Sequence, residues 1–267
     1  RGADRYGPAA PAEKEMKRAI ALILAGLALL TYPILAQYFA RKNQMQAARA
    51  YASGVEEMTR QRLDALWAEA EEKRDDPAAY EELLDPEGSG IMATLEIPKI
   101  NLTIPVYHGV SDTALRRGTG HLPETDLPLG GRGRKCVITV HRGLPVAELF
   151  TRLDELEPGD RFTLRVLGRT LTYEVEEIKT VTPGRTEVLE AVPGEDRVTL
   201  LTCTPYGVNT HRLLVEGIRV ETAETPTPEE PLPTLGRSNT WALLLGVAAG
   251  MLLLMITGLI RGKRAGR

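Results

Sequence analysis

The stretch RVTLLTCTPYGVNTHRLLVEGIRV, residues 197–220, decides the fold class of this chain. Hydrophobic and polar residues alternate through RVTLLTCT (197–204) and again through HRLLVEGIRV (211–220), as they do in half-buried strands. The Pro and Gly of the intervening TPYG favour a turn. If the two runs pair as a hairpin, Cys203 at the end of the first lies beside Arg212 at the start of the second.

Five further runs with a period of two precede this stretch, each bounded by Gly, Pro or Asp. They are ATLEIP (93–98), TIPVY (103–107), KCVITV (135–140), RFTLRVL (161–167) and RTLTYEVEEI (169–178). Leu167-Gly168-Arg169 has the character of a hairpin tip. Seven short strands with turn signals between them predict a mainly β fold, closed or nearly closed into a barrel.

The residues before the first strand have a helical period instead. Between residues 43 and 74 the apolar positions include Tyr51, Val55 and Met58, and the other positions are largely charged. This pattern predicts one amphipathic helix over 43–74, which docks on another surface or serves as a stalk. Asp75-Asp76-Pro77 ends it, because proline cannot continue a helix.

Two apolar blocks flank the rest of the chain. AIALILAGLALLTYPILA (19–36) and WALLLGVAAGMLLLMITGLI (241–260) carry no charge, and about 20 such residues cross a bilayer as a helix. Four basic residues follow the second block, and basic residues also precede the first, which favours cytoplasmic positions for both termini. A cleaved signal peptide is the alternative for the first block. The sequence begins with Arg1, and we expect the natural start to lie upstream.

Composition excludes several classes of protein. The 267 residues include 33 Lys and Arg against 36 Asp and Glu, and this net charge of −3 gives no support to a nucleic-acid binder. Aromatic residues make up 5% of the chain, too few for a base-stacking surface. With two cysteines, Cys136 and Cys203, at most one disulfide can form, so a disulfide scaffold is excluded.

One set of residues has the chemistry of a nucleophilic site. Cys203 ends a strand, and the turn after it opens its thiol to solvent. The guanidinium of Arg212 stays charged and could hold an oxyanion or a substrate carbonyl beside that thiol. His141 follows the strand CVITV and can give or take a proton near neutral pH.

The residues alone leave a structural interpretation open. A cysteine on a strand is most often buried and inert, which suits Cys136 better than Cys203. The chain has four histidines, so spacing alone does not select His141. Cys136 and His141 are five positions apart, but no second ligand pair accompanies them, and we expect no metal.

The motif TLLTC at 199–203 resembles the TLxTC signature of sortases, and Arg212 and His141 stand where that family has its arginine and histidine. Four longer segments resemble the class C, pilus-building sortases. They are EIPKINLTIPVYHG (96–109), GTGHLPETDLPLGG (118–131), HRGLPVAELFTRLDELEPGD (141–160) and TCTPYGVNTHRLLVEG (202–217). The resemblance is nearly continuous from about Gly88 to Val220.

The resemblance implies a sortase β-barrel and a cysteine transpeptidase that cleaves a Leu-Pro-x-Thr-Gly-type signal. Cys203 would attack the Thr carbonyl and form a thioacyl enzyme, His141 would act as general acid and base, and Arg212 would stabilise substrate and oxyanion. The acceptor would be a Lys amine of the next pilin, in pilus assembly on a Gram-positive cell wall. A housekeeping sortase, which anchors surface proteins to peptidoglycan stem peptides, is the alternative. No cofactor is expected; the partners are pilin or surface-protein substrates and membrane lipid, not nucleic acid.

Two features depart from the class C pattern or add to it. The lid of class C enzymes is anchored by Asp-Pro and an aromatic residue, whereas Asp76-Pro77 is followed here by Ala78. We therefore expect a mobile or missing lid and an accessible Cys203, with Tyr80 as the first candidate if a plug exists. LPTLG at 232–236, followed by a span and a basic tail, also has the layout of a sorting signal. That layout would make the chain a sorted surface protein, but Leu235 stands where Thr is required.

The predicted organisation is therefore a sortase-type closed β-barrel with short helices, preceded by an amphipathic helix and flanked by two transmembrane helices. The enzyme is expected in the cell membrane, with its catalytic domain outside the cell and both termini in the cytoplasm. The segments are a cytoplasmic tail (1–18), a transmembrane signal anchor (19–38), an N-terminal helix with a lid-like segment (43–90), the catalytic barrel (91–220), a Pro- and Glu-rich tether (221–240), a transmembrane helix (241–260) and a basic cytoplasmic tail (261–267).

Overall fold

The computed structural model describes residues 10–221 apart from 144–146, 148 and 186–188. The predicted second transmembrane helix (241–260), the basic tail (261–267) and the LPTLG segment (232–236) lie outside the described residues. The described residues 39–221, which include the barrel, belong to one compact unit, and the described residues before Phe39 belong to a separate unit.

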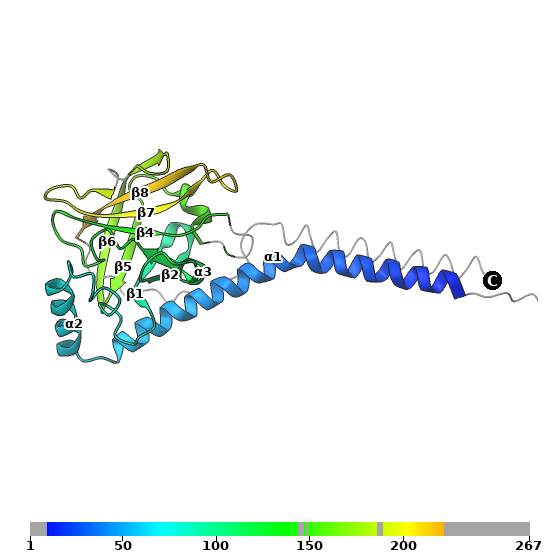
Figure 1. Cartoon of the computed structure of the whole chain (residues 1–267), viewed down its shortest axis with the longest axis horizontal. Helices are drawn as coiled ribbons and strands as arrows, with labels where there is room; N and C mark the ends of the chain where they lie inside the picture. The colour runs from blue at the N-terminus through cyan, green and yellow to red at the C-terminus, as the bar shows by residue number, and fades with distance from the viewer. Residues whose placement is uncertain (1–9, 144–146, 148, 186–188, 222–267) are drawn as a thin grey trace, which may run out of the picture. The chain divides into compact units, whose positions relative to one another are not determined.

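Eight strands close into a barrel in the order β1-β2-β3-β4-β7-β8-β6-β5 (Figure 1). This confirms the predicted closed β fold. The strands are β1 (Ile91–Ile97), β2 (Leu102–Tyr107), β3 (Thr119–His121), β4 (Arg134–Thr139), β5 (Arg161–Val166), β6 (Arg169–Val181), β7 (Asp196–Thr204) and β8 (His211–Val220). The helices are α1 (Ala10–Glu56), α2 (Arg60–Glu72) and α3 (Asp112–Arg117), with the 3-10 turns η1 (Pro98–Ile100) and η2 (Leu149–Glu155).

The strand β3 was missed by the sequence analysis, which expected seven strands. Its three residues, Thr-Gly-His, are too short to show an alternating pattern. β3 pairs in parallel with β2, where Thr119 lies opposite Val106, and antiparallel with β4, where His121 lies opposite Ile138. It is therefore the strand that joins β2 to β4 and completes the closed barrel.

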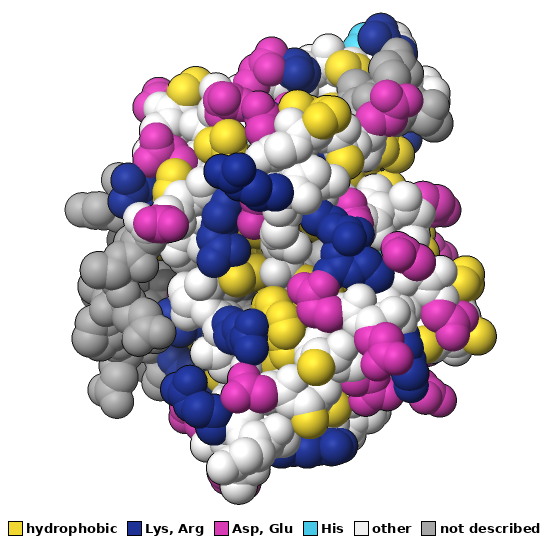
Figure 2. All heavy atoms as spheres, turned by 90° about the vertical axis from the view of Figure 1, so that its left-hand side faces the viewer, with side chains coloured by type: hydrophobic (Ala, Val, Ile, Leu, Met, Phe, Trp, Pro, Cys, Tyr) yellow, Lys and Arg dark blue, Asp and Glu magenta, His cyan; other side chains and the backbone are white. Residues whose placement is uncertain are grey.

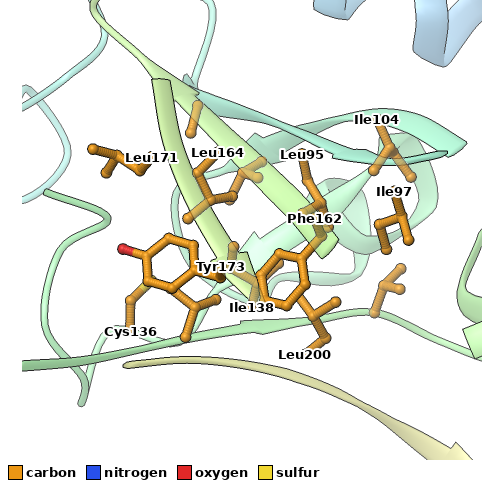
Figure 3. Close-up of a cluster of buried hydrophobic side chains, with 14 of the residues drawn as sticks. Leu95, Ile97, Ile104, Cys136, Ile138, Phe162, Leu164, Leu171, Tyr173 and Leu200 are labelled. Atoms are coloured by element: carbon orange, nitrogen blue, oxygen red, sulfur yellow. The ribbon is translucent and has the colours of Figure 1, made fainter. Parts of the chain in front are cut away.

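Apolar side chains from all sides fill the barrel interior (Figure 3). Phe162 on β5 and Tyr173 on β6 stack with their ring centroids 5.7 Å apart. Gly217 on β8 faces this pair, and a Cβ atom there would lie 2.6 Å from the Phe162 ring. A glycine is therefore required at this position by the close approach of an aromatic ring to the strand.

The predicted single helix over 43–74 is wrong in its boundaries. α1 continues from the apolar block to Glu56, and α2 begins a separate helix at Arg60. The cause is Thr59, whose side-chain oxygen accepts a hydrogen bond from the backbone N–H of Arg62 and so caps a new helix. Thr59 is the N-cap residue of α2, and it lies within a stretch whose apolar residues keep helical spacing on both sides of it.

The helices dock on the tip of the β5–β6 hairpin, as the docking interpretation predicted. The Tyr51 hydroxyl of α1 donates to the carbonyl of Met92 (3.1 Å) and accepts from the backbone N–H of Leu167 at the tip (3.3 Å). On α2, the ring of Trp67 lies 4.1 Å from the Arg169 guanidinium. The predicted hairpin tip at 167–169 is confirmed, since Val166 pairs with Arg169.

One candidate membrane span lies among the described residues. It is the apolar part of α1 within Arg18–Glu56, and none of its most apolar 18-residue window is buried. The helix runs through Pro33 without interruption. The structure thus supplies one apolar helix of sufficient length, and the second predicted span falls outside the residues described.

The face at the α2 end of the barrel carries basic and acidic side chains interspersed, with apolar groups in small separate patches (Figure 2). Cross-strand ion pairs such as Arg161–Glu174 (2.9 Å) and Arg165–Glu96 (2.8 Å) hold neighbouring strands of the barrel wall. The Arg161–Glu174 pair is exposed, whereas the Arg165–Glu96 pair is part-buried, and an exposed pair contributes about 0–1 kcal/mol.

Candidate active site

Cys203 and Arg212 lie side by side near the ends of β7 and β8. The antiparallel register of the two strands pairs Cys203 directly with Arg212. Residues paired in this way have their Cβ atoms about 4.5–5.5 Å apart. Both side chains are partly exposed. The pairing predicted from the hairpin is confirmed.

His141 follows β4, which lies beside β7 in parallel orientation. The ladder between them continues past the end of β4, because the Val140 N–H donates to the carbonyl of Leu201 (3.3 Å). The Thr202 hydroxyl also donates to the carbonyl of Val140 (2.8 Å). One further step along both strands sets His141 level with Cys203.

The three side chains share the outer face of the barrel. Val140 is buried in the core and Thr202 is 1% exposed. Because successive side chains of a strand point to opposite faces, the next residues along, His141 and Cys203, face outward. His141, Cys203 and Arg212 thus form a row across β4, β7 and β8, in the order in which these strands neighbour one another.

The loop between β7 and β8 holds the Arg212 side chain. Its backbone turns sharply, with the N–H groups of Val208 and Asn209 both donating to the carbonyl of Pro205 (3.1 and 3.0 Å). The Arg212 Nη1 atom donates to the carbonyls of Asn209 (3.4 Å) and His211 (3.2 Å). The guanidinium therefore rests against its own loop, beside Cys203.

The loop after His141 touches the loop after Cys203. Gly143 has φ of +82°, and a Cβ atom on it would lie 3.2 Å from the Gly207 nitrogen. Tyr206 and Val208 on the second loop are 54% and 64% exposed. The site thus has a close backbone contact on one side and two exposed apolar side chains next to the reacting groups.

The second thiol, Cys136, lies in the barrel interior and is 3% exposed. Desolvation by burial raises the pKa of this thiol far above its ordinary value, so it stays protonated. Cys203 is partly exposed on the outer face. Of the two cysteines, only Cys203 is placed to meet a substrate, as the sequence predicted.

The candidate lid residues Asp76 and Pro77 lie elsewhere. They line a cavity of about 950 Å³ that also includes Lys135. Lys135 is near the start of β4, six residues before His141, which corresponds to about 20 Å along a strand. Cys203, His141 and Arg212 are not among the residues that line this cavity.

Tyr80, the aromatic residue of the lid-like segment, is anchored to β3. Its hydroxyl accepts from the Gly109 N–H (2.9 Å) and donates to Nδ1 of His121 (2.9 Å). Nε2 of His121 donates to the carbonyl of Asp126 (2.9 Å), which leaves Nδ1 as the acceptor of the neutral imidazole. Desolvation by burial lowers the pKa of His121 to about 4. Tyr80 fixes its segment to the barrel through this network, and its hydrogen bonds and ring contacts are with Gly109, His108 and His121.

Arg142 is a residue that the sequence analysis passed over. It stands between His141 and Gly143, and its side chain is 5% exposed and paired with Asp154. A buried arginine is uncommon unless it is paired. The only signal in the sequence was its position directly after the candidate histidine, and its partners are at least nine residues away.

This arrangement of strands and side chains matches known proteins. A family model described as the sortase domain matches residues 95–220. Sortase D of Bacillus subtilis (strain 168) is 30% identical over 148 residues, covering 54% of this chain and 72% of that protein. The chain belongs to the sortase family. Two solved structures then specify the class.

Sortase C-1 from Actinomyces oris is 41% identical, with a TM-score of 0.57, covering 60% of this chain and 99% of that one. Sortase C of Streptococcus pneumoniae, whose structure is described as giving insight into pilin substrate specificity, is 38% identical, with a TM-score of 0.62. It covers 66% of this chain and 97% of the other. This sortase is therefore of class C, and it is a cysteine transpeptidase.

Proposed function

We propose that Cys203, His141 and Arg212 are the catalytic residues of this sortase. We further propose that it cleaves a Leu-Pro-x-Thr-Gly-type signal and joins pilin subunits through a Lys amine. The observation that carries the proposal is the row of these three side chains across β4, β7 and β8. A nucleophile, a proton carrier and a permanent cation on adjacent strands are what acyl transfer requires.

In the first half-reaction, the Cys203 thiolate attacks the Thr carbonyl carbon of the signal, and negative charge develops on the carbonyl oxygen. The C–N bond to Gly then breaks, and His141 donates a proton to the departing amine. The product is a thioester between Cys203 and the Thr carbonyl, with the Gly-led fragment released.

In the second half-reaction, an incoming amine attacks the thioester. His141 accepts the proton from that amine, the C–S bond breaks, and the thiolate of Cys203 is restored as an amide bond forms. Arg212 stabilises the oxyanion in both steps, because its charge is permanent and its N–H donors have a fixed geometry.

The pilin acceptor is supported by the sortase C structures that this chain resembles. The housekeeping alternative predicts a different acceptor, the amine of a peptidoglycan stem peptide. Purified enzyme should be given a Leu-Pro-x-Thr-Gly peptide with a pilin-derived Lys peptide, a stem peptide, or both. Preferential ligation to the Lys peptide supports pilus assembly, and exclusive ligation to the stem peptide contradicts it.

The assignment of the nucleophile is tested with a matched pair of variants. Cys203→Ala should abolish cleavage and thioester formation, whereas Cys136→Ala, in the barrel interior, should preserve most of both. Mass spectrometry of the enzyme mixed with peptide detects the thioacyl adduct directly. Full activity of the Cys203→Ala variant would overturn the proposal.

We also propose that both termini are cytoplasmic and the barrel is outside the cell, with spans at 19–38 and 241–260. The basic residues beside each apolar block support this orientation. Protease added to intact protoplasts should digest the barrel and spare a tag placed after Arg267. Loss of the tag would contradict the two-span topology.

A further inference from the structure

The strand ends that carry His141 and Cys203 are joined by a third side chain, that of Arg142. Arg142 directly follows His141, and its side chain is 5% exposed. Its Nη1 atom donates to the hydroxyl of Thr204 (3.1 Å), the residue directly after Cys203. One buried guanidinium thus spans from the residue after the histidine to the residue after the cysteine.

The other two nitrogens of Arg142 fix it to the turn η2. Nε donates to the carbonyl of Thr151 (3.2 Å), and Nη2 forms an ion pair with the carboxylate of Asp154. Every nitrogen of the guanidinium therefore has a partner. The carboxylate of Asp154 is about half exposed and balances the buried charge from the solvent side.

The location of this contact matters because the β4–β7 ladder ends just before the site. Its last backbone bond joins the Val140 N–H to the carbonyl of Leu201. His141 and Cys203 lie beyond that bond. Beyond the bonds of Val140 with Leu201 and Thr202, Arg142 supplies a further connection to β7 from the segment that follows β4.

From this geometry we infer that Arg142, held by Asp154, is a positioning residue that sets the separation of His141 from Cys203 through Thr204. This rests on the proposed roles of His141 and Cys203. Proton transfer needs donor and acceptor within hydrogen-bond reach, so small displacements of one strand end lower the rate. Because the Arg142 side chain is buried and its guanidinium nitrogens are bonded to Thr151, Thr204 and Asp154, the role inferred is positioning and not contact with substrate.

Arginine is suited to this role where lysine is not. The planar guanidinium presents donors in three directions from one rigid group, whereas an ammonium is a point charge on a flexible stem. Arg142→Lys therefore keeps the charge next to Asp154 but cannot bond Thr204 and Thr151 at the same time. A change in rate in this variant would therefore be due to the lost hydrogen bonds and not to a lost charge.

The test measures kcat and KM for transpeptidation by the full chain in detergent, with a Leu-Pro-x-Thr-Gly peptide and an amine acceptor. For Arg142→Lys, kcat should fall by about 100-fold, as displacements of about 1 Å can cause, with KM changed less than about threefold. The matched control is Arg165→Lys, which disrupts the Arg165–Glu96 pair between β5 and β1 and should leave both constants unchanged.

A second pair of variants keeps the inference testable if Arg142→Lys does not fold. Thr204→Val removes the hydroxyl that accepts from Arg142, and kcat should fall by about tenfold. Thr204→Ser retains that hydroxyl and should recover most of the rate. In the double variant with Arg142→Lys, Thr204→Val should cause no further loss, because both changes remove the same contact.

Wild-type kcat in Arg142→Lys, or equal losses in Thr204→Val and Thr204→Ser, would overturn the inference. A rise in KM with kcat unchanged would also overturn it, since that result indicates a role in binding. These outcomes are distinct from failure of the proposed function, because there Cys203→Ala itself would remain active.

Discussion

Lowering the pH from about 7.5 to about 4 should destabilise this sortase through one buried residue, His121. The imidazole is fully buried on β3 and neutral, with Nδ1 accepting from Tyr80 and Nε2 donating to Asp126. Desolvation holds its pKa at about 4, against an ordinary value of 6.5. Protonation in the folded state would reverse the bond between Tyr80 and Nδ1, because both ring nitrogens would then be donors, and it would place a charge at a buried site.

The sign follows from which state binds the proton. Between pH 6.5 and 4 the unfolded chain takes up a proton at His121 and the folded chain does not, so stability falls as the pH falls. Above about pH 7.5 His121 is neutral in both states and contributes little pH dependence. The difference between the two pKa values corresponds to about 3 kcal/mol, at roughly 1.4 kcal/mol per pKa unit.

Urea unfolding at a series of pH values measures this loss as the change in the free energy of unfolding. Carboxylates titrate in the same range, so the decisive quantity is the difference between wild type and His121→Gln. Glutamine stays neutral and offers one acceptor and one donor group. Between about pH 7.5 and 4, the free energy of unfolding of the His121→Gln variant should therefore fall by about 3 kcal/mol less than that of wild type. His211→Gln, at the start of β8 and partly exposed, is the control and should follow wild type. Parallel curves for wild type and His121→Gln would refute the reasoning.

Three further predictions concern the site and the barrel. Arg212→Lys keeps the charge but loses the planar fork, so kcat/KM should fall by about 10- to 100-fold without a change in Tm; wild-type kinetics would remove Arg212 from the site. Asp76→Ala should leave the alkylation rate of Cys203 within about twofold of wild type, because Asp76 is exposed and lines a cavity that does not include Cys203; a hundredfold acceleration would reveal a plug over the thiol. Gly217→Ala should lower stability by about 1–3 kcal/mol, because its Cβ would meet the Phe162 ring at 2.6 Å, and an unchanged Tm would contradict that packing.

The pairing of Cys203 with Arg212 could be predicted from sequence because it is local. The two residues are nine positions apart, on strands joined by a short turn, so alternation and turn chemistry suffice to set them side by side. The burial of Cys136 followed from the same alternation, since that residue lies inside a strand run. The alternation of apolar and polar residues along a strand indicates which face of the sheet each residue occupies, and this does not depend on how the strands are ordered.

The boundaries that were wrong show where periodicity fails. β3 has three residues, fewer than the roughly four to eight over which alternation is recognised, and it is a strand only because β2 and β4 supply hydrogen bonds on both sides. The break between α1 and α2 depends on one cap, Thr59, within an unbroken apolar period. In both cases a few hydrogen bonds decide where the element begins and ends, although the spacing of apolar residues predicts otherwise.

By itself, the sequence determined the mainly β fold class, the identity of the outward-facing thiol and its arginine neighbour, because alternation and the β7–β8 hairpin involve residues close in the chain. Closure of the barrel, by contrast, joins distant strands such as β1 and β5. Only the tertiary structure decided that His141 lies level with Cys203, 62 positions later, since this requires β4 and β7 to be parallel neighbours. It also decided that Asp76 and Tyr80 line a cavity that does not include Cys203, and that Arg142 is bonded to Thr204, the residue after Cys203. These contacts are set by strand order, and residues distant in the sequence carry no local pattern that reports it.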